Sequence, residues 1–197
     1  MSPELEKIIR QNVQDESAYR AIYELITGND SSVMGQVDYL AILHQLTSSH
    51  YDSLDALFMT YLRVGCDVFG IEHGTIRQIV QETAVTQAVF PQSSAQPTEI
   101  PLNYLMCSYV AQHRQTIANH HISPDQILHQ DTQVACYIGT PLVIDNTLWG
   151  TLSFHNSHAR NHHFTGAEIQ FIELLAQNIS QAISTLKTQH QPTQKHY

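Results

Sequence analysis

Two apolar segments separated by only two residues constrain this chain more than any other feature. Residues 135–144 and 147–155 are both long enough to be strands, and Asp145 and Asn146 stand between them. Because both turn residues tolerate a positive φ angle, the pattern predicts a tight β-hairpin. In the second segment the residues Leu148, Gly150, Leu152 and Phe154 alternate with Trp149, Thr151, Ser153 and His155. This alternation predicts a sheet with one apolar face and one mixed, partly polar face.

Further predicted elements fit around this hairpin. Strand-type patterns predict two more strands at 74–80 and 84–90, a polar loop at 91–101 and a short strand at 115–118. Apolar residues at helical spacing predict helices over 5–26, 37–46, 54–69 and 104–114. The order of these elements predicts an α+β fold, in which a central antiparallel sheet has helices on both faces and follows an N-terminal helical segment.

The last helix has the clearest start signal in the sequence. Thr165 and Glu168 fit a capping box, in which each side chain bonds the other residue's backbone amide. Phe171, Leu174 and Leu175 suit packing on a sheet. A second apolar set steps alternately by three and four residues: Ile169, Ile172, Ala176, Ile179, Ile183 and Leu186. This spacing is typical of a coiled-coil seam, so we predict a homodimer through this helix and the N-terminal one.

Chain length and composition define the domain organisation and exclude some partners. We divide the 197 residues into a helical linker or dimerisation segment at 1–50, one folded domain at 51–188 and a flexible tail at 189–197. With 18 acidic and 9 basic residues the net charge is −9 when the 13 His are neutral. A mild polyanion is a poor binder of nucleic acid or anionic lipid, so we expect neither partner.

Three further observations point to the cytoplasm. The three Cys are an odd number, are widely spaced and form no CxxC pair, which favours reduced thiols over a disulfide framework. The acidic N-terminus lacks a signal-peptide pattern, and the sequence has no run of 18 apolar residues that could span a membrane. We therefore expect a cytoplasmic protein.

Three segments carry a resemblance to a known family. Residues 136–154 are similar to a hairpin written S-Y-x-G-x-P-L, a turn, then x-G-x-L-x-F, while 101–107 and 164–168 resemble two helix entries. From about Leu54 to Ile183 the chain thus resembles a GAF domain, the small-molecule-sensing module of bacterial and eukaryotic signalling proteins. The match is specific for the fold and unspecific for the ligand.

The resemblance implies where a ligand would bind. One sheet face would pack on the first and last helices, and the segment between about Pro91 and Thr132 would close the other face over a pocket. The residues expected in that pocket are Tyr104, Cys107, Tyr137, Gly139, Trp149, Thr151, Ser153 and His155. In the alternative interpretation the protein's own side chains fill this space, and Trp149 belongs to the core.

Two familiar ligand classes of the family are disfavoured by particular residues. The Cys that attaches a bilin in phytochrome-like members would fall near Pro124 and Asp125, neither of which can form a thioether. The phosphodiesterase-type motif for cyclic nucleotides would fall at 156–169, where its Lys and one carboxylate are missing. The sequence therefore leaves the cofactor or ligand unidentified.

Catalytic and metal-binding interpretations have weaker support. Cys107 resembles a position in the free methionine-(R)-sulfoxide reductases, but Cys136 lies inside a predicted strand, where a thiol is usually an inert small hydrophobe. The phosphate-binding and hydrolase motifs are absent. Adjacent loop His residues seldom chelate one ion, so we expect no metal at the histidines 120, 121, 129, 158, 162 and 163. We therefore predict a protein that is not an enzyme.

The function expected from these patterns is that of a bacterial GAF sensor. It would bind a small molecule or a partner and transmit the signal through the terminal helices of a homodimer to a signalling partner or output domain outside this chain. The alternative is a ligand-free GAF scaffold for protein–protein interaction. A cavity at Tyr137, Trp149, Ser153 and His155 would favour sensing, whereas a face plugged by Tyr104 and its neighbours would favour the scaffold.

Overall fold

A six-stranded antiparallel sheet organises the domain. The computed structural model describes residues 38–92, 98–123 and 134–189. The strand order is β3-β2-β1-β6-β5-β4, and every neighbouring pair is antiparallel. The strands are β1 (His73–Val80), β2 (Thr83–Phe90), β3 (Glu99–Pro101), β4 (Ile117–Asn119), β5 (Cys136–Ile144) and β6 (Thr147–Asn156). The predicted hairpin is therefore confirmed as β5 and β6.

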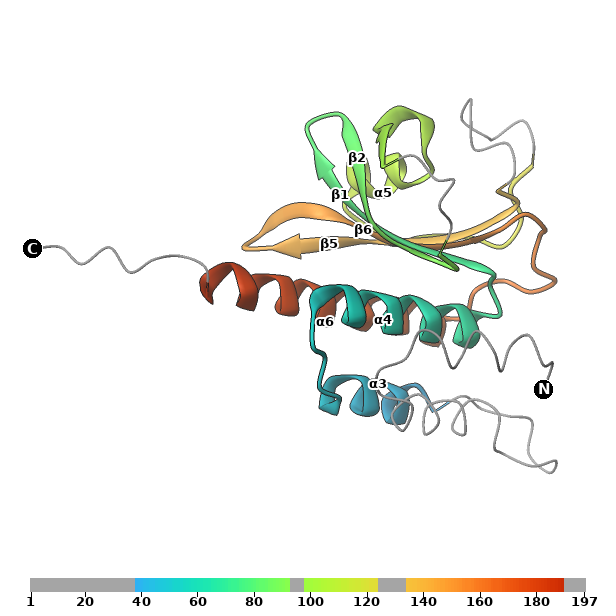
Figure 1. Ribbon diagram of the computed structural model, residues 1–197. Helices are drawn as coiled ribbons and strands as arrows, with labels where there is room; N and C mark the ends of the chain where they lie inside the picture. The colour runs from blue at the N-terminus through green and yellow to red at the C-terminus, as the bar shows by residue number, and fades with distance from the viewer. Residues whose placement is uncertain (1–37, 93–97, 124–133, 190–197) are drawn as a thin grey trace, which may run out of the picture.

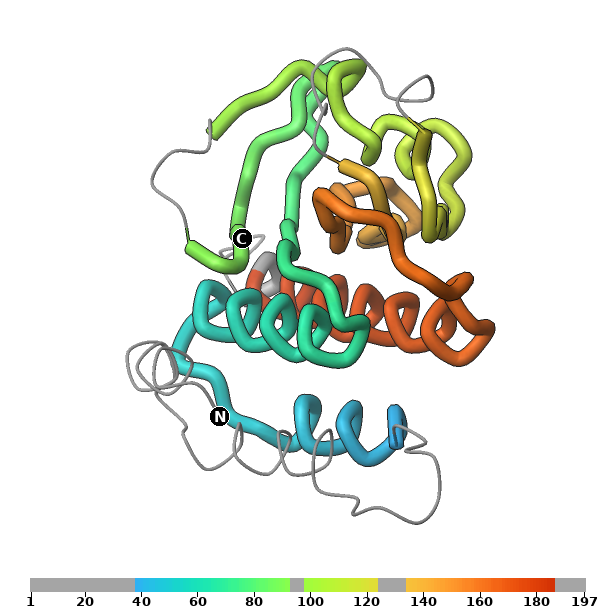
Figure 2. The backbone as a smooth tube through the Cα atoms, turned by 90° about the vertical axis from the view of Figure 1, so that its right-hand side faces the viewer, coloured from blue at the N-terminus to red at the C-terminus, as the bar shows by residue number. Residues whose placement is uncertain are grey.

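Helices cover both faces of this sheet (Figure 1). On one face lie α4 (Leu54–Phe69) and α6 (Gly166–Gln189), which contact each other and the sheet. Figure 2 shows α3 (Tyr39–Ser48) on the far side of these two helices from the sheet. The opposite face carries the 3-10 turn η1 (Leu102–Tyr104) and α5 (Cys107–His113). The predicted α+β architecture is confirmed, while the helix predicted at 5–26 lies outside the described residues.

Local sequence signals explain where several elements begin and end. Asp145 and Asn146 both take positive φ angles, 50° and 59°, in the two-residue turn. At the start of α6, the Thr165 amide donates to Glu168 Oε2 at 2.7 Å, and the Glu168 amide donates to Thr165 Oγ1 at 3.2 Å. The capping box is therefore confirmed, because both reciprocal bonds are present. Gly70 ends α4 in the left-handed region, with φ at 62°.

The main core lies between the sheet and α4 with α6. Phe69 is at its centre, with ring centroids 5.1 Å from Phe154 of β6 and 5.9 Å from Phe171 of α6. Gly65 of α4 makes room for this packing, because a Cβ atom there would overlap the Phe154 ring. The apolar residues of the hairpin thus face the helices, as the alternation predicts.

Two sequence-based expectations need correction. The coiled-coil seam is not a free second face of α6: Ile172, Ala176, Ile179 and Ile183 are at most 4% exposed and belong to the chain's own core. Their burial follows from helical geometry, since these residues share one side of α6 with Phe171 and Leu175, which face the sheet. Of the six seam residues, Ile169 and Leu186 keep partial exposure. The other correction concerns Glu99–Pro101, predicted as loop, which pairs with β2 as strand β3.

No helix within the described residues is both long enough and apolar enough to cross a bilayer.

Candidate ligand-binding face

Five of the six predicted pocket residues of the hairpin lie in rows across the α5-covered face of the sheet. Tyr137 pairs with His155, which pairs with His73. In the next row Gly139 pairs with Ser153, which pairs with Thr75, and beyond it Thr151 pairs with Arg77. Their strand neighbours Ile138, Leu152, Phe154 and Ile76 belong to the main core on the opposite side. The period of two along β6 therefore separates these two sets of side chains.

A hydrogen-bonded polar cluster occupies the middle of this face. The hydroxyls of Thr75 and Ser153 are 2.9 Å apart, and Arg77 Nη1 donates to Thr75 Oγ1 at 3.2 Å. Thr151 lies beside Arg77 in the register. All four side chains are buried, and Arg77 is only 8% exposed. We call Thr75, Arg77, Thr151 and Ser153 the polar cluster.

Two atoms of the polar cluster lack a hydrogen-bond partner among the described residues. These are Nε of Arg77 and Oγ1 of Thr151, and both are buried. Arg77 forms no ion pair with a carboxylate of the described residues. Burying a polar or charged group without compensation is costly, which makes this arrangement unusual for plain core packing.

His155 lies at one end of the cluster in an environment that keeps it neutral. Its ring stacks on His73 with centroids 5.2 Å apart and an interplanar angle of 22°. Burial lowers the pKa of His155 to about 4, and the charges of His73 and Arg77 act in the same direction. His155 is therefore uncharged near pH 7 and can offer one donor and one acceptor nitrogen.

Apolar side chains flank the polar cluster on both sides. Tyr137 packs with Met106, Val110, Ile122 and Val134 in one cluster. Cys107 packs with Ala84 and Leu105 in another. A Cβ atom at Gly139 would meet the Tyr137 side chain, so this glycine lets the tyrosine fold over the face.

The remaining predicted site residues lie at the border of the face. Tyr104 is half-buried at the end of η1. Trp149 is also half-buried, but it packs against the main core cluster, as the alternative interpretation of this residue expects. Thr75 and Arg77 were missed by sequence reasoning. Their alternation with Ile76 within β1 was the signal that could have placed them, because it puts both on the same face as Ser153.

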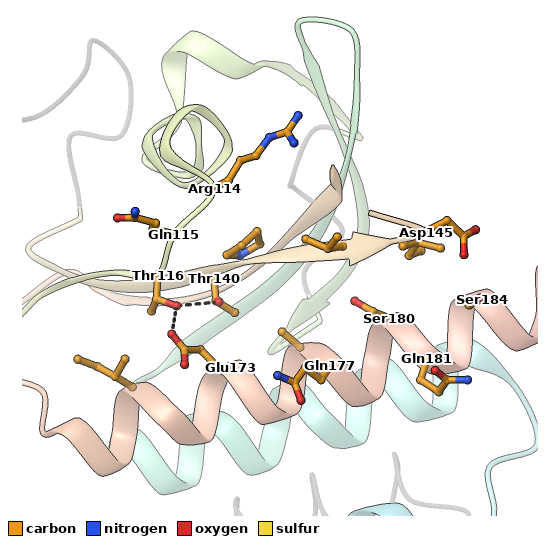
Figure 3. A pocket seen from close by; sticks show the side chains of 15 residues that line it. Arg114, Gln115, Thr116, Thr140, Asp145, Glu173, Gln177, Ser180, Gln181 and Ser184 are labelled. Carbon is orange, nitrogen blue, oxygen red and sulfur yellow. Dashed lines mark hydrogen bonds between the residues drawn. The ribbon is translucent and has the colours of Figure 1, made fainter. Parts of the chain in front are cut away.

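Two cavities among the described residues lie away from this face. One of about 840 Å³ lies between α6 and the β5 edge and includes Arg114, Thr116, Thr140 and Glu173 in its lining (Figure 3). There Thr116 Oγ1 donates to Glu173 Oε1 at 2.7 Å. Another of about 640 Å³ lies along β2 and α4. Neither cavity is lined by the residues of the predicted pocket.

The cysteines of this domain are buried, and two of them have raised pKa values. No disulfide joins Cys66, Cys107 and Cys136, and all three thiols are buried. Burial raises the pKa of Cys136 to about 11 and that of Cys66 well above its ordinary value, which disfavours the nucleophilic thiolate. No group of three or more His, Cys, Asp or Glu side chains in this part of the chain could hold a metal ion. His129 lies outside the described residues.

Comparisons with known proteins agree on one fold. A family model described as GAF domain matches residues 53–183. None of the curated proteins matches the sequence.

Solved structures extend this likeness over most of the chain. The GAF domain of a phosphoenolpyruvate-protein phosphotransferase from Acinetobacter is similar with a TM-score of 0.65, at 16% identity over 80% of this chain and 98% of that one. Its counterpart from Coxiella burnetii has a TM-score of 0.66, at 18% identity over 77% and 96%. The free methionine-R-sulfoxide reductase of Neisseria meningitidis, solved with its substrate, has a TM-score of 0.63, at 18% identity over 81% and 97%. At these identities the likeness concerns the fold.

Proposed function

Because the chain belongs to the GAF domain family, a general sensory and regulatory fold, we propose that it is a non-enzymatic sensor for a small polar molecule. The binding site in this proposal is the α5-covered face of the sheet, centred on Thr75, Ser153 and their neighbours in the polar cluster. The observation that carries the proposal is the burial of Arg77 Nε and Thr151 Oγ1 without partners among the described residues.

Physical chemistry favours a ligand at this place over plain packing. A buried polar atom left without a hydrogen bond costs about 1–3 kcal/mol, and native proteins keep few of them. Ligand sites usually combine apolar walls with a few convergent polar groups, which is the arrangement on this face. A bound molecule that supplied the missing partners would recover the lost free energy.

A separate observation supports a second candidate function, the ligand-free scaffold. The apolar side chains around Tyr137 fill one flank of the face, and the two cavities described above lie outside it. In this alternative the polar cluster is a structural device within a rigid interaction platform. Only a binding experiment separates the two functions.

Native mass spectrometry of the purified full chain is that experiment. We expect a retained small molecule on the wild type, and its loss in Ser153→Leu, which fills the centre of the face. Thr147→Leu, at the exposed start of the same strand, is the matched control and should retain it. If the wild type carries nothing and no metabolite fraction changes its melting temperature, the scaffold function is favoured instead.

The proposed output runs through the sheet to the helices on its other side. β1 and β6 carry the polar cluster on one face and the main core with α4 and α6 on the other, so a ligand that spreads or tightens these strands would shift both helices.

A homodimer also belongs to the proposal, although its contact cannot use the buried side of α6. Leu40 on α3 is 74% exposed and offers an apolar alternative.

The cellular setting of the proposal is the cytoplasm. The protein's three buried cysteines form no disulfide, a pattern that suits a reducing compartment. In this proposal the signal passes to a signalling partner or output domain outside this chain.

A further inference from the structure

We infer that the ligand of the α5-covered face is a small carboxylate, held by the guanidinium of Arg77 together with the hydroxyl of Thr151. This inference rests on the proposed sensory function and adds the chemical class of the ligand. Four observations lead to it, and they concern the position of Arg77, its free donor, its uncompensated charge and its neighbours.

Arg77 is fixed on the face by its own strand. β1 is held on both sides, by β2 and by β6, so the backbone of Arg77 cannot move its side chain to solvent without disrupting the sheet. The Nη1 bond to Thr75 fixes one end of the guanidinium at 3.2 Å. At 8% exposure, the side chain is held inside the domain.

The donors that remain match a planar, two-oxygen acceptor. Nε lies on the edge of the guanidinium and has no partner among the described residues. An edge of this kind binds a carboxylate through two parallel N–H···O bonds, a geometry that lysine cannot reproduce. Thr151 is paired with Arg77 in the register, and its unpartnered hydroxyl can donate a further bond to the same group.

The electrostatics of the face require a single negative charge. No carboxylate of the described residues pairs with Arg77, and the nearby His155 is uncharged near neutral pH. Thr75 and Ser153 add only neutral hydroxyls. A monoanion would therefore balance the face, whereas an uncharged ligand would leave a buried cation uncompensated.

The test compares carboxylates with their uncharged amides on the full chain. Acetate and acetamide, propionate and propionamide, and benzoate and benzamide are titrated while the melting temperature is recorded, with inorganic phosphate as a separate arm. We expect at least one carboxylate to raise the melting temperature saturably, and its amide to leave it unchanged. Stabilisation by phosphate with none by carboxylates would overturn the carboxylate assignment.

Three variants test whether the rise in melting temperature with carboxylate depends on Arg77. Arg77→Met should remove the carboxylate response and raise the melting temperature of the ligand-free protein, because it removes a buried unpaired charge. Arg77→Lys keeps the charge but loses the planar edge, and should weaken binding about tenfold or more. Arg114→Met, at an exposed arginine after α5, is the matched control and should bind like the wild type. An unchanged response in Arg77→Met would overturn the inference, and Arg77→Lys decides the case if Arg77→Met does not fold.

The chain itself could supply the carboxylate, and this outcome is distinguishable. Asp125 and Asp131 lie outside the described residues, so each is changed to Asn alone and together with Arg77→Met. If the shifts in melting temperature are strongly non-additive for either pair of substitutions, an internal carboxylate balances Arg77 and the inference is wrong.

Native mass spectrometry separates the failure of this inference from the failure of the proposed function. If it finds a bound uncharged molecule, the sensory function stands and the carboxylate class fails. If nothing binds at all, both fail.

Discussion

Arg160 and Glu168 form a short ion pair, with 2.7 Å between Nη2 and Oε1, that joins the segment after β6 to the first turn of α6. The two side chains are 17% and 7% exposed. Arg160 also lies 4.3 Å from the centroid of the Phe164 ring, and Glu168 accepts the capping bond from Thr165. One carboxylate therefore serves both the ion pair and the helix cap.

Removal of this charge should destabilise the domain. Glu168→Gln retains a side chain that can cap the helix, but it leaves Arg160 partly buried without its anion. We expect a loss of about 2–3 kcal/mol in the free energy of unfolding, measured by urea denaturation. Glu82→Gln in the exposed β1–β2 turn should change it by less than about 0.5 kcal/mol. Equal effects of the two variants would contradict a structural role for the pair.

Gly65 should be intolerant of a methyl group although it lies inside a helix. Alanine normally favours a helix by about 1 kcal/mol over glycine. At Gly65 the added Cβ would overlap the Phe154 ring, so we expect Gly65→Ala to destabilise by about 1–3 kcal/mol in thermal or urea unfolding. Gly166→Ala is the control, because a Cβ there meets nothing within 4 Å. A stabilised Gly65→Ala protein would show that the ring moves aside without cost.

A substitution at Ile179 tests whether this residue belongs to the core of the single chain and not to a coiled-coil contact between two chains. Because Ile179 is fully buried in the single chain, Ile179→Ala should lower the free energy of unfolding by about 2–5 kcal/mol. The loss should not depend on protein concentration, whereas a residue at a dimer contact would give a concentration-dependent midpoint. Gln181→Ala on the exposed side of α6 is the control. Light scattering on both variants reports the assembly state independently.

His155 should make folding stability depend on pH. Its pKa is lowered to about 4 in the folded protein, against an ordinary value near 6.5. Below pH 6.5 the unfolded chain takes up a proton that the folded protein does not, so this residue lowers stability as pH falls toward 4. The contribution approaches about 3 kcal/mol at the acid end.

The measurement is a series of urea unfolding curves between pH 7 and pH 4. His155→Phe should show a shallower pH dependence of stability than the wild type, because phenylalanine takes up no proton in the unfolded chain. The phenylalanine ring can still stack on His73, so the fold should be kept. His44→Phe, on the exposed side of α3, should keep the wild-type slope. Parallel curves for His155→Phe and wild type would show that His155 is not held neutral.

Methionine sulfoxide reduction tests the non-enzymatic proposal. Cys107 is 1% exposed and Cys136 is fully buried with a raised pKa, so neither suits attack on a sulfoxide. We expect no turnover of free methionine-(R)-sulfoxide with a thiol reductant, and no difference between wild type and Cys107→Ser. Turnover that disappears in Cys107→Ser would establish the reductase instead.

Local patterns in the sequence predicted most of the described helices and strands and the α+β fold. Asp145 and Asn146 fix the hairpin turn, Thr165 and Glu168 fix the start of α6, and the alternation along β6 separates its two faces. Each of these features depends on residues within a few positions of one another, so backbone dihedral preferences and short-range hydrogen bonds decide them. A short strand such as β3 has too few residues for a pattern to be recognised.

The tertiary structure decided which side of α6 is buried and which polar atoms share the α5-covered face. The sequence showed two apolar sets on α6, and only packing against the sheet and the neighbouring helices showed that both are buried, Ile172 and Ile179 together with Phe171 and Leu175. The bond between Thr75 and Ser153 joins residues 78 positions apart, and Arg77 is buried beside them through the same strand pairing. Period and propensity are properties of neighbouring residues, whereas burial and missing hydrogen-bond partners depend on chain segments that meet only in the folded domain.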